Sequence, residues 1–325
     1  MDLGQEFKDK YIKYKKKYIN LKHSQTGGYN IQNNFIDIEK KLENKLMTAS
    51  IRCDNNFKEL FNQTDTTSNL IPKMVILYGP PGSGKSSILK YLKENLKIDL
   101  PVKILIDDIV IKTSGYEEIT DDIINKHAEL SAKITSSTDK EELDKILNRL
   151  LTDVYNKFRR LKGCGDDISN KLLEESLKAR KNIIYEGTGR NSSIDWLLNV
   201  CDRAKKEKYD VIIIFPFVKL DILKERVKKR YGKISSSKEP RLIDDNLLTS
   251  TFQESHNNFE KIANYYNTDR VFVIDNNATI TDPNKSDLYT TLFEINKTKT
   301  CNTKITDYTD HYYGQLKDFL MKNCK

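Results

Sequence analysis

The stretch VILYGPPGSGKSS, residues 75–87, sets a continuous apolar run directly before a glycine-rich loop and a Lys-Ser pair. The run begins with KMVILY (73–78), and an unbroken apolar series is typical of a strand buried on both faces of a sheet. The segment SSILKYLKENL (86–96) follows with apolar residues at helical spacing. A strand, Gly79-x4-Gly84-Lys85-Ser86 and a helix, in that order, are the context that a P-loop requires.

The glycines, the lysine and the serine of this loop would each contribute to binding phosphate. Glycines let backbone N–H groups point at phosphate oxygens, and the N-terminus of the following helix adds the positive end of a dipole. Lys85 would reach the β- and γ-phosphates, and Ser86 would coordinate Mg²⁺. The sequence therefore predicts nucleotide binding by Gly79, Gly82, Ser83, Gly84, Lys85, Ser86 and Ser87.

Four further apolar runs alternate with segments of helical periodicity. This alternation predicts an α/β fold of the P-loop NTPase/kinase-like type, with a parallel five-stranded sheet and helices on both faces. The predicted strands are 73–78, 101–106, 182–187, 209–218 and 270–275. The predicted helices are two within 117–162, and others at 166–180, 192–207, 220–232 and 244–266.

Changes in composition predict four regions. Residues 1–28 form a basic amphipathic leader helix, 29–72 a helical extension and linker, 73–280 the P-loop kinase domain and 281–325 a C-terminal extension. The leader repeats aromatic and leucine residues every three or four positions among lysines and stops at Gly27-Gly28. It would dock on a protein or an anionic surface, or pack on its own domain. The two glycines would be a processing site or a hinge.

The overall charge and the cysteines bound the class of protein. The net charge of +8 fits anionic partners, or simply a lysine-rich solvated surface. The cysteines lack a CxxC pair, which predicts free thiols in a reducing, cytoplasmic setting. No apolar run approaches the length of a membrane span. The cysteines are Cys53, Cys164, Cys201, Cys301 and Cys324.

An acidic pair, Asp107-Asp108, closes the second apolar run in ILIDDIV (104–110). The pair predicts a carboxylate that faces an acceptor hydroxyl and takes its proton during phosphoryl transfer. Asp108 is the preferred base, because it would be freer to face the cleft, and Asp107 is the alternative. Two other interpretations remain: a Walker B pair of an ATP-driven motor, or aspartates that only cap a turn or helix.

Polar side chains also follow the third run, in NIIYEGTGR (182–190). Ligands of open α/β sheets bind beyond the carboxyl ends of the strands, so Glu186 should lie near Lys85 and Asp108. Glu186 and Thr188 could bind hydroxyls or amides of a substrate, and Glu186 could instead orient Mg²⁺ through water. Arg190 follows in the same loop.

A basic segment, ERVKKRYGKISSSKEPR (225–241), comes after the fourth run. Arg226 and Arg230 are four residues apart on a predicted helix, and Arg241 lies beyond a Gly, Ser and Lys stretch. Mobile basic segments of this kind close over phosphates in kinases, where arginine neutralises the transferred group. The alternative is an ordinary solvated helix end.

Together these residues resemble the zeta toxin family of P-loop kinases, over roughly 73–275. The resemblance rests on GPPGSGKSS, Asp108, IIYEGTGR, the Arg230-Tyr231 pair with Arg241, and VFVID. It implies a kinase that uses ATP and Mg²⁺ to phosphorylate a hydroxyl of a UDP-N-acetylhexosamine. It further implies that Lys85 and Ser86 hold nucleotide and metal and that Asp108 is the base. The substrate side would be Glu186, Thr188 and Arg190, and the phosphate clamp Arg230 and Arg241.

Other features leave the substrate and setting open. The long region between Asp108 and Glu186 and the Ser- and Lys-rich segment depart from the family and bear on acceptor choice. The basic leader is similar to one on proteins of large cytoplasmic DNA viruses, which implies host cytoplasm or a virion. Two other functions compete with a small-molecule kinase: a polynucleotide or nucleoside kinase, and a non-catalytic ATP-binding switch that docks on a partner.

Overall fold

The computed structural model describes residues 31–49, 53–62, 71–85, 88, 98, 101–231, 243–265, 270–277, 290–295 and 301–303. The predicted leader lies outside these residues, as do Ser86, Ser87 and Arg241. The predicted domain boundaries at 28, 72 and 280 stay predictions.

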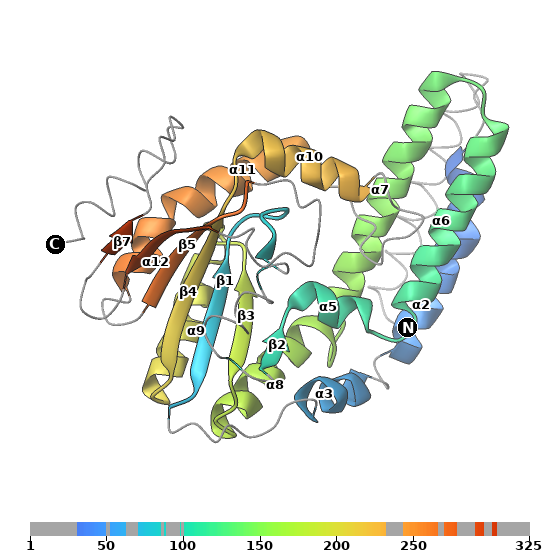
Figure 1. Cartoon of the computed structure of the whole chain (residues 1–325). Helices are drawn as coiled ribbons and strands as arrows, with labels where there is room; N and C mark the ends of the chain where they lie inside the picture. The colour runs from blue at the N-terminus through green and yellow to red at the C-terminus, as the bar shows by residue number, and fades with distance from the viewer. Residues whose placement is uncertain are drawn as a thin grey trace.

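The sheet has seven strands in the described part of the chain, in the order β2-β3-β1-β4-β5-β6-β7 (Figure 1). The first five strands in this order are parallel, which confirms the predicted parallel α/β sheet. The pair β6 and β7 continues the sheet in antiparallel fashion beside β5 and was not predicted. The strands are β1 (Lys73–Tyr78), β2 (Val102–Ile104), β3 (Ile183–Gly187), β4 (Asp210–Phe217), β5 (Arg270–Asp275), β6 (Thr290–Ile295) and β7 (Cys301–Thr303).

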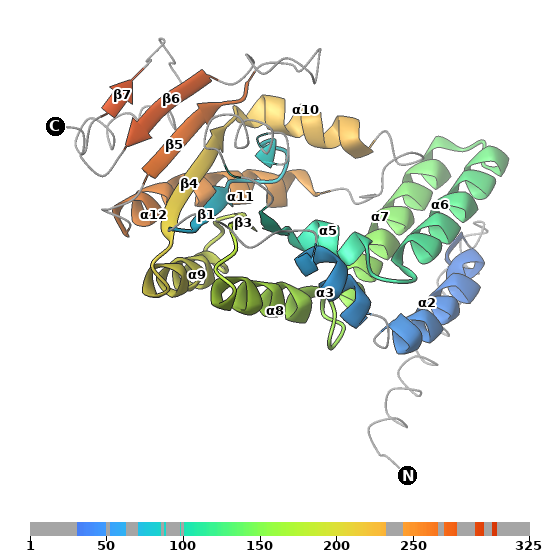
Figure 2. The same cartoon turned by 60° about the horizontal axis from the view of Figure 1, so that its bottom comes forward.

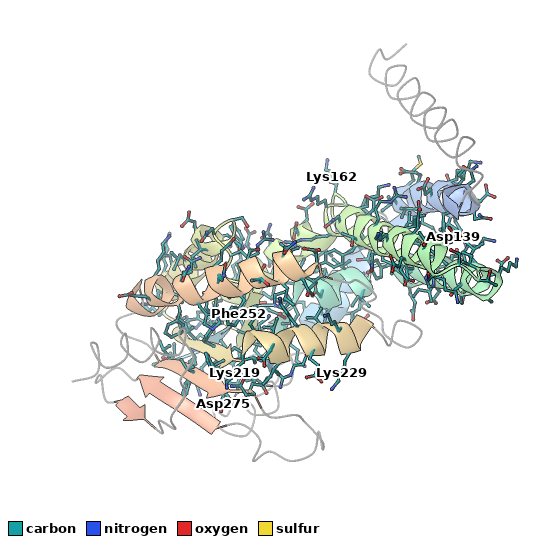
Figure 3. All side chains as sticks on the ribbon, turned by 90° about the horizontal axis from the view of Figure 1, so that it is seen from above. Asp139, Lys162, Lys219, Lys229, Phe252 and Asp275 are labelled. Atoms are coloured by element: carbon teal, nitrogen blue, oxygen red, sulfur yellow. A yellow bond between two sulfur atoms is a disulfide. The ribbon has the colours of Figure 1, made fainter. Side chains whose placement is uncertain are left out.

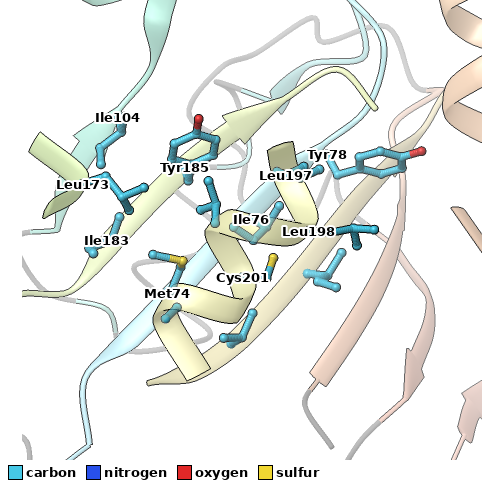
Figure 4. Packing of buried hydrophobic residues seen from close by; sticks show 14 of the residues in the cluster. Met74, Ile76, Tyr78, Ile104, Leu173, Ile183, Tyr185, Leu197, Leu198 and Cys201 are labelled. Atoms are coloured by element: carbon cyan, nitrogen blue, oxygen red, sulfur yellow. The ribbon is translucent and has the colours of Figure 1, made fainter. Parts of the chain in front are cut away.

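Apolar residues pack on both faces of the parallel strands. Alternate residues of β1 point to opposite faces, so Met74, Ile76 and Tyr78 pack with α8 (Gly165–Lys178), α9 (Ile194–Lys206) and α12 (Phe259–Tyr265). Figure 2 shows these helices along one face, and Figure 4 shows residues of α8 and α9 packed on the strand residues. Val75 and Leu77 pack on the other face with Ile88 and Ile98, from the segment that follows the P-loop.

A second apolar core forms a helical arm beyond β2. It joins α2 (Ile36–Ala49), α6 (Tyr116–Lys133) and α7 (Ser137–Arg159), which lie side by side in Figures 1 and 2, with Val110 of α5 (Ile106–Ile111). The 3₁₀ turn η1 (Ile31–Phe35) packs there through Phe35. In Figure 3, Asp139 marks the far end of the arm and Lys162 lies near its base. No helix in the described residues is long and apolar enough to cross a membrane.

The remaining helices lie over the carboxyl edge of the sheet (Figure 1), and the one over Leu220–Tyr231 agrees with the predicted helix at 220–232. The expected single helix over 244–266 is wrong, because Asn258 separates α11 (Asp245–Asn257) from α12. Helix α10 (Leu220–Tyr231) and α11 share a small core with Val218, Leu223, Val227, Leu248 and Phe252.

The prediction of free thiols is wrong for Cys53 and Cys164, which form a disulfide. The pair is separated by 111 residues, so spacing gave no sign of it. The fold brings α3 (Cys53–Asn62) against α8, and the Cα atoms lie 5.3 Å apart, within the usual range for a disulfide. Cys201 is buried and forms no disulfide within the described residues.

Candidate active site

The P-loop follows β1 directly and keeps a conformation that glycines allow. Gly82 and Gly84 have φ angles of 81° and 84°, in the left-handed region where other residues are strained. The hydroxyl of Ser83 is buried and has no hydrogen-bond partner among the described residues. A glycine-lined turn with an orphaned buried hydroxyl fits an oxyanion such as phosphate.

Lys85 is almost entirely buried and points into the same site. Its Nζ donates hydrogen bonds to the carbonyl oxygens of Gly79, at 2.8 Å, and Pro80, at 3.0 Å. The same Nζ lies 3.2 Å from Glu186 Oε1. The predicted convergence of the P-loop lysine and the carboxylate after β3 is therefore present, although 101 positions (186 − 85) separate them.

Asn276, which follows β5, holds the P-loop from behind. Its side-chain N–H donates to the Ser83 carbonyl oxygen at 2.7 Å, and its backbone N–H donates to Phe217 at 3.0 Å. A Cβ on Gly84 would lie 2.1 Å from the Asn276 side-chain nitrogen, so glycine is required there for close packing as well as for its φ angle. Sequence reasoning missed Asn276, because one asparagine after a strand carries no recognisable signal.

Asp107 and Asp108 lie on a helix, which corrects the prediction that they end a strand. Strand β2 ends at Ile104 and both aspartates are in the first turn of α5, because ILIDDIV satisfies the apolar pattern of a short strand and of a helix alike. Carboxylates in a first helical turn are stabilised by the helix dipole. The alternative that these aspartates only cap a helix does not match their place, because Leu105 is the N-cap of α5 and no side chain caps it. A catalytic role for Asp108 stays a prediction.

The two aspartates have different surroundings. The hydroxyl of Tyr155, from α7, donates to Asp107 Oδ1 at 2.5 Å, and Asp107 is half-buried. Asp108 is the more exposed of the two, and its carboxylate has no hydrogen-bond partner in the described part of the chain. Asp107 is thus held by the arm, whereas Asp108 is open to a ligand.

Electrostatic interactions tie Asp108 to the rest of the site. Partial burial, then the negative charges of Glu186 and Asp107, raise the pKa of Asp108. Lys112 and Lys103 act in the opposite sense without reversing the shift. A raised pKa makes this carboxylate a stronger base than an ordinary aspartate.

The EGTGR loop is fixed by its neighbours on both sides. The Gly79 N–H donates to the Gly187 carbonyl oxygen at 3.1 Å, which extends the pairing of β1 with β3 into the P-loop. Asn258 donates to the Gly189 carbonyl oxygen at 3.0 Å from the break between α11 and α12. Gly189 has a φ of 69°, and a Cβ there would lie 1.8 Å from the ring of Tyr78. That ring is itself fixed, because the Tyr78 hydroxyl donates to the Ser255 carbonyl oxygen.

The other predicted site residues are placed less fully. Thr188 and Arg190 are half-buried in the EGTGR loop, and the Arg190 Nε is buried without a partner among the described residues. Arg226 donates to the Asn276 carbonyl oxygen at 2.7 Å and so supports the P-loop. Arg230 is in α10, but its side chain, like Arg241, lies outside the described residues.

The described residues contain no group of three or more His, Cys, Asp or Glu side chains that could hold a metal ion. Ser86, the predicted Mg²⁺ ligand, lies outside them. Coordination by one serine together with nucleotide phosphates needs no such group.

Comparison with known proteins bears on the second half of this site. Residues 164–287 match the family model described as "Zeta toxin", and this range contains Glu186, Thr188, Arg190, Arg230 and Arg241. Over this range the predicted resemblance to the zeta toxin family is confirmed. The P-loop and Asp108 precede it.

Individual relatives cover the chain unequally. The chain is 30% identical over 230 residues to uncharacterized protein L872 of Acanthamoeba polyphaga mimivirus, covering 64% of this chain and 62% of the relative. It is 28% identical over 161 residues to a pachytene checkpoint protein 2 homolog of Homo sapiens, covering 47% of this chain and 32% of the relative. The chain thus spans less than two thirds of each relative's length.

A solved structure shows a weaker likeness. A chain from the PezAT chromosomal toxin–antitoxin system of Streptococcus pneumoniae is 13% identical, with a TM-score of 0.46. The match covers 86% of this chain and 94% of that one.

The contact between Asn276 and Ser83 predicts an effect on nucleotide binding that general destabilisation does not produce. Asn276→Ala should lower the free energy of unfolding by about 1–3 kcal/mol and weaken Mg·ATP binding roughly tenfold, because the P-loop loses its support. Asn182→Ala is the matched control: Asn182 is equally buried and accepts a hydrogen bond from the Lys73 N–H at the opposite end of β1. Thermal unfolding and calorimetric titration check both variants. Equal loss of ATP affinity in the two would show that Asn276 has no special role.

The packing of Gly189 against Tyr78 predicts an unusually costly glycine substitution. Gly163→Ala is the control, since Gly163 has a φ of 77° and open space around its Cβ position. Gly163→Ala should cost about 1–2 kcal/mol for the left-handed backbone alone. Gly189→Ala should cost about 1–3 kcal/mol more because of the clash. Denaturant unfolding measures both, and equal losses would contradict the fixed position of the Tyr78 ring.

Proposed function

We propose that this chain, whose residues 164–287 match the zeta toxin family, is an ATP-dependent phosphotransferase that phosphorylates a hydroxyl of a small molecule. A UDP-N-acetylhexosamine is the first candidate acceptor. The observation that carries the proposal is the convergence of Lys85, Glu186 and Asp108 at the carboxyl edge of one sheet. A lysine that holds phosphate and a carboxylate that accepts the hydroxyl proton are groups used in such a transfer.

The residues divide between the two substrates. The P-loop backbone, Lys85 and Ser86 would hold the phosphates of ATP and its Mg²⁺, which supply the phosphoryl group and neutralise its charge. Glu186, Thr188 and Arg190 would bind the acceptor, and Arg230 and Arg241 would neutralise the transferred group. Asp108 would accept the hydroxyl proton of the acceptor.

The mimivirus relative supports a viral setting, and the lysine-rich leader agrees with it. The protein would then act in host cytoplasm or in a virion, with the leader helix docked on a protein or an anionic surface. This setting is independent of the chemistry and would stand with any acceptor.

The decisive experiment offers labelled Mg·ATP with three acceptor pools: UDP-N-acetylhexosamines, nucleosides with their monophosphates, and 5′-hydroxyl oligonucleotides. Label on the UDP-sugar is expected. Label on a nucleoside or oligonucleotide would keep the kinase and replace its acceptor. Bound ATP with no transfer to any pool would favour the switch instead.

The different surroundings of the acidic pair predict which aspartate is the base. Asp108→Asn should abolish transfer while leaving Mg·ATP affinity nearly unchanged, whereas Lys85→Ala should lose both. Asp107→Asn should retain measurable transfer, because the new side-chain oxygen can still accept the Tyr155 hydrogen bond. Steady-state rates and calorimetric titration separate these outcomes. An inactive Asp107→Asn beside an active Asp108→Asn would move the base to Asp107.

The raised pKa of Asp108 predicts the pH dependence. Only the ionised carboxylate can accept a proton, so kcat/KM should fall with decreasing pH through a pKa above the ordinary 3.8. Asp107→Asn removes one of the charges that raise this pKa, so the acid limb should move to lower pH. Asp139→Asn, at the far end of the arm (Figure 3), should leave the limb in place. An unmoved limb in Asp107→Asn would mean that another group titrates.

A further inference from the structure

Lys85 and Glu186 are each committed to the other in this structure. The Lys85 side chain is 6% exposed and the Glu186 side chain 23%, and their charged atoms are 3.2 Å apart. The remaining donors of Lys85 are directed at two carbonyl oxygens of its own loop. These three contacts together satisfy the charge and the donors of this buried ammonium.

The same two side chains are needed elsewhere in the proposed reaction. An ammonium has three donors, and all three are directed at Gly79, Pro80 and Glu186. A phosphate can engage Lys85 only by replacing some of these contacts. Glu186 likewise cannot give its full charge to an acceptor while it pairs with Lys85.

The backbone around Lys85 and Glu186 is fixed, so only their side chains would move in this exchange of partners. Register pairing of Leu77 with Glu186 and of Tyr78 with Gly187 fixes the end of β3 beside β1. Asn276 fixes the P-loop through Ser83. A lysine on its flexible four-carbon stem can change partners without movement of either support.

We propose that the Lys85–Glu186 ion pair is a latch between the two substrate sites: nucleotide phosphate takes Lys85, and only then is Glu186 free to bind the acceptor. The reaction would therefore have a compulsory order, with Mg·ATP before the acceptor. The inference rests on the proposed function, but its first consequence concerns nucleotide binding alone. If the pair must break when nucleotide binds, removing it in advance should strengthen that binding.

The test measures Mg·ATP affinity by calorimetric titration of the full chain with no acceptor present. Glu186→Gln keeps the size of the side chain and removes its charge, and should bind Mg·ATP about three- to tenfold more tightly than wild type. Asp108→Asn is the matched control, because it removes a negative charge from the same site without touching Lys85. Asp108→Asn should change the affinity by less than twofold.

Thermal unfolding supplies a second measurement on the same proteins. Because the latch requires the ion pair to break when nucleotide binds, Glu186→Gln should lower the Tm of the protein measured without nucleotide. Saturation with a non-hydrolysable ATP analogue should remove most of that difference from wild type. A difference that persisted at saturation would show that Glu186 stabilises both states equally, and the latch would be wrong.

The outcomes separate the latch from the proposed function. Tighter binding by Glu186→Gln alone supports the latch. The latch is wrong if Glu186→Gln binds Mg·ATP with the same affinity as wild type. It is also wrong if Asp108→Asn gains as much affinity as Glu186→Gln. Either result leaves the proposed kinase activity intact. Absence of Mg·ATP binding by the wild-type protein overturns the proposed function and the latch with it.

Discussion

The parallel pairing of β1 with β3 is the constraint on which the site depends. It places Leu77 opposite Glu186 and Tyr78 opposite Gly187, and the hydrogen bond from Gly79 to Gly187 extends the pairing into the P-loop. Two loops that are about 100 positions apart in the chain therefore leave the sheet side by side. The lysine of one and the carboxylate of the other meet because both strands end at the same edge.

At this edge, each loop of the site is held by residues from elements far away in the sequence. Asn276 and Arg226 support the P-loop, while Asn258 and Tyr78 hold the EGTGR loop. The helical arm contributes Tyr155, which binds Asp107 and so fixes the first turn of α5. Arg159 continues this network one turn along α7: burial lowers its pKa, but the hydrogen bond to Asp166 and the charges of Asp166 and Asp107 raise it overall. A site built on a rigid edge with several independent braces holds its groups in place before ligands arrive.

The sequence predicted those features of the fold and site that appear as local patterns of residues. Apolar runs identified the five parallel strands, and the P-loop motif carried its own strand–loop–helix context. Contacts between distant segments gave no such signal. Asn276, Tyr155 and the Cys53–Cys164 pair have meaning only once the sheet order is known. The prediction for ILIDDIV was wrong because the short strand β2 and the six-residue helix α5 share one apolar pattern. The break at Asn258 was not predicted because one asparagine does not interrupt helical periodicity.

The described residues leave the site with an excess of negative charge, so phosphate binding there would need further positive charge. Asp107, Asp108 and Glu186 lie together, and the carboxylates of Glu186 and Asp107 already disfavour ionisation of Asp108. Lys85 balances one of these charges, and Lys103 and Lys112 lower the pKa of Asp108 without reversing its rise. Nucleotide phosphates would add several more negative charges to this edge, so their binding needs cations that move in with them. The predicted sources of these cations are a metal ion held at Ser86 and the predicted arginine clamp of Arg230 and Arg241. The acidity of the site therefore supports the prediction that the basic segment 225–241 acts on bound phosphates, over the alternative of an ordinary solvated helix end.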